Sequence, residues 1–401
     1  MESVPGWAQA VRQILGAVQH ARPDDLPRLV RGLAPVLGGT ALVIYLVDYD
    51  QVRLVPLQQD GAADPAPDVE SSVPGRVFTT GQPVDVAGPA GGHRLWLPLV
   101  NGGDRLGVLA VDSAEAIPDN RWPDVQVLAA LLAKVLISRR RYGDAVEFTR
   151  RRQPMQVAAE IIWSQLPPLT LSTPQVAISG ILEPCYEIGG DSFDYAVNGD
   201  TLHVGLFDAV GHGIGASTVT ALAVSVYRNA RRCGLDLSDT YRSIDKWIHA
   251  EYPDRFLTAT LAELDTRTGT YRRISAGHPG ELLLRDGRLC KELSAPTAMP
   301  LGWGQLADPV PTVAEEALQP GDRMLLYTDG VVEARTADGQ FFGTDRLVEF
   351  VTRGLADQLP APETLRRLIR AILAHQYQQI QDDATAVLLE WRPELTYGPW
   401  A

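Results

Sequence analysis

The first part of the chain alternates between helical and extended patterns of apolar residues. Apolar positions recur at helical spacing over residues 7–37, and residues 40–47, rich in β-branched side chains, follow as a predicted strand. Residues 94–100 and 105–112 flank an Asn-Gly-Gly-Asp turn and form the clearest predicted hairpin. A helix over residues 123–140 closes this part, which we interpret as one α/β domain.

Residues 141–168 read as a charged helical linker. Two arginine triplets flank a polar stretch, and helical spacing continues to Leu166, where Pro167 and Pro168 end it. We expect a long helix that acts either as a signalling linker, pairing with its copy in a dimer, or as a solvated connector. The arginines also suit anionic lipid or nucleic acid, although a solvated face is the more common use of such charges.

Strand patterns dominate the second half. They cover residues 176–182, 194–197, 201–207, 256–265, 270–275, 281–285, 323–327 and 384–391. Two helical blocks, residues 215–232 and 237–251, interrupt them. Strands, then two helices, then strands again predict an α+β sandwich in which helices cover sheets.

Length and charge narrow the class of protein. A chain of 401 residues is expected to form two or three domains, and 45% hydrophobic residues can build ordinary cores. A net charge of −13 disfavours a general nucleic-acid binder, which would need a basic face. It also disfavours a polyanionic substrate unless metal ions invert the local field.

The three cysteines are widely spaced, so we expect neither a disulfide framework nor structural zinc, and a reducing setting. The first residues lack the basic and apolar regions of a signal peptide. The longest apolar stretch, residues 125–137, is too short to span a bilayer and contains Lys134. The sequence therefore predicts a cytoplasmic protein without a membrane span.

Four short acidic motifs stand at the mouths of predicted strands or beside glycine turns. They are Gly189-Gly190-Asp191, Asp208-Ala209-Val210-Gly211-His212-Gly213, Thr328-Asp329-Gly330 and Asp382-Asp383-Ala384-Thr385. Carboxylates gathered by a fold raise one another's pKa unless a cation lies between them. Such hard oxygen ligands suit Mg²⁺ or Mn²⁺, and two of these ions make a hydrolytic centre for phosphate esters.

Each motif alone has a second interpretation. Asp191 could be an ordinary turn residue, and the Gly-Gly-Asp triplet also occurs in diguanylate cyclases, where Glu-Phe follows instead of Ser192-Phe193. His212, between two glycines, could be a ligand, a general acid or an exposed turn residue; we favour a structural or substrate-positioning role. Because neighbouring side chains of a strand alternate, only one of Asp382 and Asp383 is expected to reach a common centre.

The N-terminal part resembles a GAF domain. Residues 72–78 and 81–84 are similar to that family's helix-and-strand segment, and residues 97–109 are similar to its last hairpin. The resemblance implies a sensor or dimerisation domain over residues 1–140. The sensor ligand stays open: no cysteine is available there for a thioether-linked bilin, and His20 and His93 are too few to argue for haem.

The second half resembles the metal-dependent protein phosphatases of the PPM family, in particular the bacterial SpoIIE-type branch. The matching segments are 187–191, 208–213, 256–260, 275–279, 299–302, 321–333, 342–343 and 382–385. The resemblance implies a β-sandwich flanked by helices over residues 169–392, with residues 393–401 as a tail.

The resemblance also implies a set of site residues. Metal carboxylates fall on Asp191, Asp208, Asp329 and the Asp382–Asp383 pair, with Asp382 preferred, and the carbonyl of Ala209 matches a backbone ligand. Two Mn²⁺ or Mg²⁺ ions would support hydrolysis without a covalent phosphoenzyme. His212 is displaced from the family's histidine, and no arginine matches its phosphate ligand, so both roles stay unassigned. Residues 276–279 are expected to shape a loop near the site.

The implied function is removal of phosphate from serine or threonine of a STAS-type anti-sigma-factor antagonist, in bacterial partner switching. The N-terminal domain would adjust this activity in a homodimer, in response to a small-molecule or protein effector. One alternative is a degenerate phosphatase fold that only binds partners. Another is a nucleotide cyclase or nuclease, which would need a base-reading pocket or basic groove that the sequence does not indicate.

Overall fold

The chain divides into two units between Gln153 and Pro154 in the computed structural model. The structure describes residues 5–37, 39–57, 66–88, 91–187, 189–294, 296–306, 311–377 and 382–392. The tail expected over residues 393–401 therefore lies outside the described residues.

The first unit is built on a five-stranded antiparallel sheet in the order β2-β1-β5-β4-β3. Its strands are β1 (Ala41–Val47), β2 (Leu54–Pro56), β3 (Val84–Ala87), β4 (His93–Asn101) and β5 (Asp104–Ser113). The predicted hairpin is confirmed, since β4 pairs with β5 up to Asn101 and Asp104.

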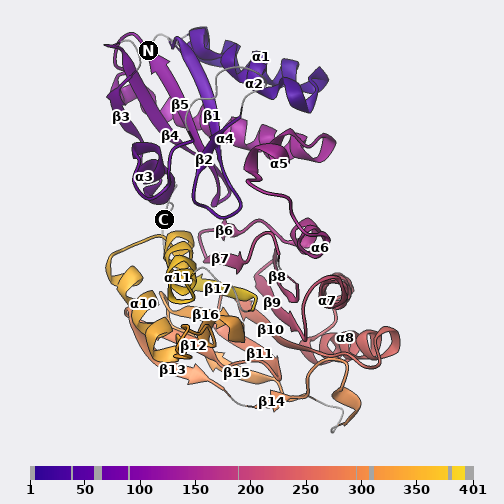
Figure 1. Ribbon diagram of the computed structural model, residues 1–401. Helices are drawn as coiled ribbons and strands as arrows, with labels where there is room; N and C mark the ends of the chain where they lie inside the picture. The colour runs from indigo at the N-terminus through magenta and orange to yellow at the C-terminus, as the bar shows by residue number, and fades with distance from the viewer. Residues whose placement is uncertain are drawn as a thin grey trace. The chain divides into compact units, whose positions relative to one another are not determined.

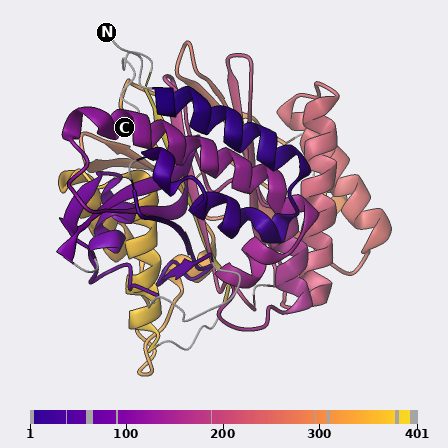
Figure 2. The same ribbon diagram turned by 90° about the horizontal axis from the view of Figure 1, so that it is seen from above.

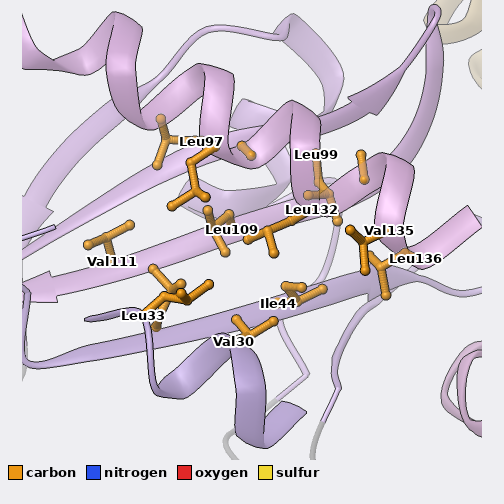
Figure 3. Packing of buried hydrophobic residues seen from close by; sticks show 14 of the residues in the cluster. Val30, Leu33, Ile44, Leu97, Leu99, Leu109, Val111, Leu132, Val135 and Leu136 are labelled. Atoms are coloured by element: carbon orange, nitrogen blue, oxygen red, sulfur yellow. The ribbon is translucent and has the colours of Figure 1, made fainter. Parts of the chain in front are cut away.

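Helices cover both faces of this sheet. They are α1 (Pro5–His20), α2 (Leu26–Arg31), α3 (Val73–Thr80) and α4 (Trp122–Arg139). On one face, Val30 and Leu132 pack against strand residues such as Leu97 and Leu109 (Figure 3). On the other face, Phe78 of α3 joins the cluster around Tyr45 and Trp96. This two-sided burial explains the strongly apolar strands.

The single helix expected over residues 7–37 is wrong. Helix α1 ends at His20, a 3-10 turn covers Pro23–Asp25, and α2 begins only at Leu26. Proline has no amide hydrogen and disfavours a helical conformation of the residue before it. Pro23 therefore separates α1 from α2, which the apolar spacing predicted as one helix.

The continuous linker helix expected up to Leu166 is also wrong. Two short helices replace it, α5 (Ala145–Arg150) and α6 (Val157–Gln165). Residues 151–156 between them contain Pro154, and Gly143 before α5 is extended. Proline and glycine both interrupt a helix. The pattern of charged and apolar positions alone therefore predicted too long a helix.

Two six-stranded sheets form the core of the second unit. The first has the order β14-β11-β10-β9-β8, with β15 on β11, and the second has the order β13-β12-β16-β17-β7-β6. The strands are β6 (Thr170–Ser172), β7 (Val176–Glu183), β8 (Asp191–Asn198), β9 (Thr201–Ala209), β10 (Leu257–Asp265), β11 (Thr270–Ala276), β12 (Glu281–Arg285), β13 (Arg288–Leu293), β14 (Thr297–Ala298), β15 (Ala314–Ala317), β16 (Arg323–Tyr327) and β17 (Ala384–Trp391).

The sheets face each other through one apolar layer. Phe193 and Leu206 of the first sheet pack with Ile178, Met324 and Val387 of the second. Each sheet uses its outer face to bury helices, which gives four layers. The α+β sandwich predicted from the sequence is confirmed.

Two groups of helices form the outer layers. Helices α7 (Ile214–Arg232) and α8 (Leu237–Glu251) lie side by side against the first sheet (Figure 1 and Figure 2). Helices α9 (Asp329–Val332), α10 (Thr344–Ala356) and α11 (Ala361–His375) pack on the second. None of the described helices combines the length and hydropathy needed to cross a bilayer.

Candidate metal centre

Five aspartates meet at one end of the sandwich. Asp191 opens β8 and is paired directly with Asp208 near the end of β9. On the other sheet, Asp329 follows β16, and Asp382 and Asp383 precede β17, the neighbouring antiparallel strand. Antiparallel neighbours bring the end of one strand beside the start of the next. Both sheets thus contribute carboxylates to the same end.

The pKa shifts show that these carboxyl groups act on one another. Burial and then the charges of Asp208 and Asp383 raise the pKa of Asp191 well above its ordinary value. Burial raises the pKa of Asp208 to about 7, with further contributions from Asp329, Asp382 and Asp383. The pKa of Asp329 is raised by its burial and by Asp382. A cluster of this kind keeps protons unless a cation neutralises it.

Asp191 is held in place by two threonines of the opposite sheet. The hydroxyl of Thr328 donates to Asp191 Oδ2 at 2.6 Å, and it accepts the backbone N–H of Thr385 at 3.0 Å. Thr328 and Thr385 also join through a backbone hydrogen bond. All three residues are buried, so the carboxylate of Asp191 has a fixed orientation.

Asp383 and Asp382 have different surroundings. Asp383 Oδ2 accepts the backbone N–H groups of Gly189, Gly190 and Asp191 at 2.8, 2.6 and 3.3 Å. Asp382 is exposed, and its Oδ1 accepts the N–H of Asp383 at 2.9 Å. Three donors on one oxygen make Asp383 a clamp on the segment that carries Asp191. The charges of both aspartates act on Asp208, so which of the two would bind an ion stays a prediction.

Glycines allow the backbone segments to approach one another closely at this end of the sandwich. A Cβ atom on Gly190 would lie 2.5 Å from the carbonyl oxygen of Ala209, and one on Gly330 would lie 1.9 Å from that of Asp383. The carbonyl of Ala209 therefore lies against a backbone without a side chain. With the aspartates around it, the donor set consists of oxygen atoms, as Mg²⁺ and Mn²⁺ prefer. The oxygen donors present fit divalent cations of this kind.

His212 lies beside this centre without entering it. It is exposed between Gly211 and Gly213, which adopt φ values of 92° and 75°. Its Cα would be 2.8 Å from a Cβ on Gly189, so its backbone packs on the glycine pair while its side chain faces solvent. The structure thus places His212 in an exposed turn, and the structural or substrate-positioning role favoured from the sequence stays a prediction.

Thr258, Thr328 and Thr385 lie in motifs or matching segments of the sequence, but no role was assigned to them there. Their positions in the fold indicate one, because Thr258 is paired with Asp208 and Thr328 donates to Asp191. Cys185 is buried, with Sγ 3.1 Å from Glu183 Oε1.

A model of one protein family matches the C-terminal part of the chain. Residues 198–392 match the family described as stage II sporulation protein E (SpoIIE). The chain is 23% identical to Protein IcfG of Synechocystis sp. over 54% of its own length and 38% of that protein. It is 22% identical to phosphoserine phosphatase RsbU of Bacillus subtilis over 59% of its length and 70% of that protein.

Two solved structures are also similar. One contains the RsbU and RsbW domains of Rv1364c from Mycobacterium tuberculosis (23% identity, 56% of this chain, 63% of that one, TM-score 0.49). The other is the SiaA-PP2C domain of Pseudomonas aeruginosa (21% identity, 58% of this chain, 94% of that one, TM-score 0.48). The family match thus makes residues 198–392, which lie in the second unit, similar to a SpoIIE-type domain.

Proposed function

We propose that the second unit is a phosphatase that removes phosphate from phosphoserine or phosphothreonine of a protein, with two bound Mn²⁺ or Mg²⁺ ions. The observation that carries this proposal is the convergence of aspartates from both sheets at one end of the sandwich. Its relative RsbU, which bears the name phosphoserine phosphatase, supports the choice of substrate chemistry.

Asp191, Asp208, Asp329 and Asp382, with the carbonyl of Ala209, would hold the ions. When bound, the ions supply a Lewis acid for the phosphoryl oxygens and an activated water for hydrolysis. Asp383 stays with the backbone N–H groups of Gly189 and Gly190 and keeps that segment in place. Thr328 orients the carboxylate of Asp191. A buried Cys185 is no candidate nucleophile, which agrees with hydrolysis without a covalent phosphoenzyme.

The substrate that we propose is a STAS-type anti-sigma-factor antagonist phosphorylated on serine or threonine. The SpoIIE family match and the likeness to RsbU support it. We propose further that residues 1–140 are a GAF-like sensor or dimerisation domain of a homodimer that responds to an effector. The order of sequence motifs supports this assignment, as does the antiparallel sheet with helices on both faces.

The first experiment compares hydrolysis of a small aryl phosphate by the wild type and by Asp329→Asn, with Mn²⁺ and with chelator. Asp200→Asn is the matched control, because Asp200 is exposed in a hairpin turn. We expect Mn²⁺-dependent activity in the wild type and the control, and its loss in Asp329→Asn. Full activity in Asp329→Asn would contradict the two-metal proposal, and a wild type that binds Mn²⁺ without hydrolysis would favour the degenerate alternative.

A second experiment addresses the substrate and the first unit. A phosphoserine-bearing STAS-type protein should lose its phosphate faster than the aryl phosphate at equal concentration. Removal of residues 1–153 should change either the oligomeric state, measured by light scattering, or the rate of this reaction. If both stay as in the full chain, the proposed role of the first unit is wrong.

A further inference from the structure

His278 is a buried histidine with a hydrogen bond at each ring nitrogen. Nε2 lies 3.1 Å from the carbonyl oxygen of Tyr327, and Nδ1 lies 2.8 Å from Oγ1 of Thr258. Its own carbonyl accepts the hydroxyl of Ser275 at 3.1 Å. The side chain is 7% exposed, so neither ring nitrogen depends on water for a partner.

The partners of His278 fix its tautomer. A carbonyl oxygen can only accept, so Nε2 carries the hydrogen and donates to Tyr327. Nδ1 of the neutral ring then accepts from the Thr258 hydroxyl. Burial lowers the pKa of His278 to about 4, which agrees with a neutral ring at neutral pH. The imidazole of His278 thus joins Tyr327 and Thr258, with Nε2 as the donor and Nδ1 as the acceptor.

The two hydrogen-bond partners of the His278 ring lie on different sheets. Thr258 belongs to β10 and is paired directly with Asp208 of β9, within reach of its carboxyl group. Tyr327 is the last residue of β16, two positions before Asp329. His278 itself lies in the segment that leaves β11 of the first sheet and enters β12 of the second. It therefore joins the neighbourhoods of two aspartates that come from separate sheets.

We propose that His278 is a positioning residue of the metal centre, which sets the separation of Asp208 and Asp329 by joining Thr258 to the end of β16. The inference rests on the proposed function, because it assigns a role at the same site. It goes beyond the loop-shaping role expected for residues 276–279. Hydrogen bonds behind metal ligands orient those ligands, and their loss commonly weakens metal binding by about 10- to 100-fold.

Mn²⁺ affinity of the full chain, measured by titration calorimetry, tests the proposal independently of hydrolysis. Thr258→Val and His278→Gln both remove the bond between Thr258 and Nδ1, while the glutamine amide can still donate to Tyr327. We expect each to weaken Mn²⁺ binding by about 10- to 100-fold. Thr258→Ser keeps the hydroxyl and should bind Mn²⁺ as the wild type does. Since both single variants lose the same bond, the double variant should be no weaker than the worse single one.

His203→Gln is the matched control, because His203 lies on β9 with Asp208 but faces Glu263 at 3.2 Å. Wild-type affinity in Thr258→Val would overturn the inference, as would additive losses in the double variant. If His278→Gln does not fold, as judged by circular dichroism, the comparison of Thr258→Val with Thr258→Ser decides alone. A wild type that binds no Mn²⁺ would overturn the proposed function and this inference with it.

Discussion

Thr328 donates a hydrogen bond to Asp191 at 2.6 Å, although the two residues are 137 positions apart in the chain and Thr328 follows a strand of the other sheet. The same hydroxyl accepts the N–H of Thr385, so one oxygen connects three segments. These hydrogen bonds hold Asp191, a proposed ligand of the metal centre, in place.

Replacing Thr328 by valine should destabilise the second unit. The change keeps the shape of the side chain, but it leaves the buried N–H of Thr385 and the carboxyl of Asp191 without this partner. We expect a loss of about 1–3 kcal/mol in the free energy of unfolding, measured by denaturant titration. Thr328→Ser retains the hydroxyl and is the control. Equal stability of the valine and serine variants would contradict the structural role.

Asp382 and Asp383 should respond differently to the same change. Asp382→Asn removes a proposed ligand charge and is expected to abolish Mn²⁺-dependent hydrolysis. Asp383→Asn keeps a carbonyl oxygen that can accept from the glycine N–H groups, so part of the activity should remain. Steady-state kinetics of both variants at a series of Mn²⁺ concentrations would check this order. The reverse order would make Asp383 the ligand.

Mn²⁺ should stabilise the folded protein against heat. An ion that binds only the folded state adds about 2.7 kcal/mol of stability at a concentration of about 100 Kd. We expect this gain in the wild type, measured as a rise in Tm, and its loss on addition of a chelator. Asp191→Asn should show little or no rise. An equal rise in this variant would place the bound ion elsewhere.

Glu281 should make stability depend on pH. It is buried, it accepts the Tyr271 hydroxyl at 2.6 Å, and burial raises its pKa to about 7 despite Arg273 at 4.0 Å. A carboxyl whose pKa is higher in the folded state holds its proton more tightly there. Its contribution to stability is therefore present at low pH and is lost as pH rises from the unfolded value, 4.5, to about 7.

The test for Glu281 is Glu281→Gln, which mimics the neutral acid. Its unfolding free energy should match the wild type at about pH 4 and exceed it at about pH 8 by a difference on the order of 1–3 kcal/mol. Glu315→Gln serves as the control, because Glu315 is exposed beside Arg272. An unchanged pH dependence in Glu281→Gln would show that Glu281 is ionised in the folded protein.

Eight of the twelve described strands of the second unit match a predicted range, most of them as apolar runs, whereas the short or exposed strands β6, β13, β14 and β15 were not predicted. The start of β8 was placed too late, at residue 194 instead of Asp191, since Asp191 and Ser192 look like turn residues. They are buried strand residues because Thr328 and the paired Asp208 surround Asp191. A strand that begins with polar functional residues is therefore not fully predicted from the pattern of hydrophobic positions.

Helices α10 and α11 were not predicted, although their apolar faces meet the outer side of the second sheet through residues such as Leu347, Val351, Leu368 and Ile372. At the site, the aspartates were singled out because they stand at the mouths of predicted strands or beside glycine turns. The loop of His278 was expected near the site, but its hydrogen bond to Thr258 was not, since it depends on a contact between the two sheets.

The proposed metal-binding end of the sandwich is formed by two sheets that pack against each other through one apolar layer. Asp191 and Asp208 lie on one sheet, while Asp329 and Asp382 adjoin strands of the other. Their mutual spacing is therefore a measure of shear between the sheets. A small displacement of one sheet, transmitted through α7 or α11, would therefore change the distances between the aspartates of the two sheets.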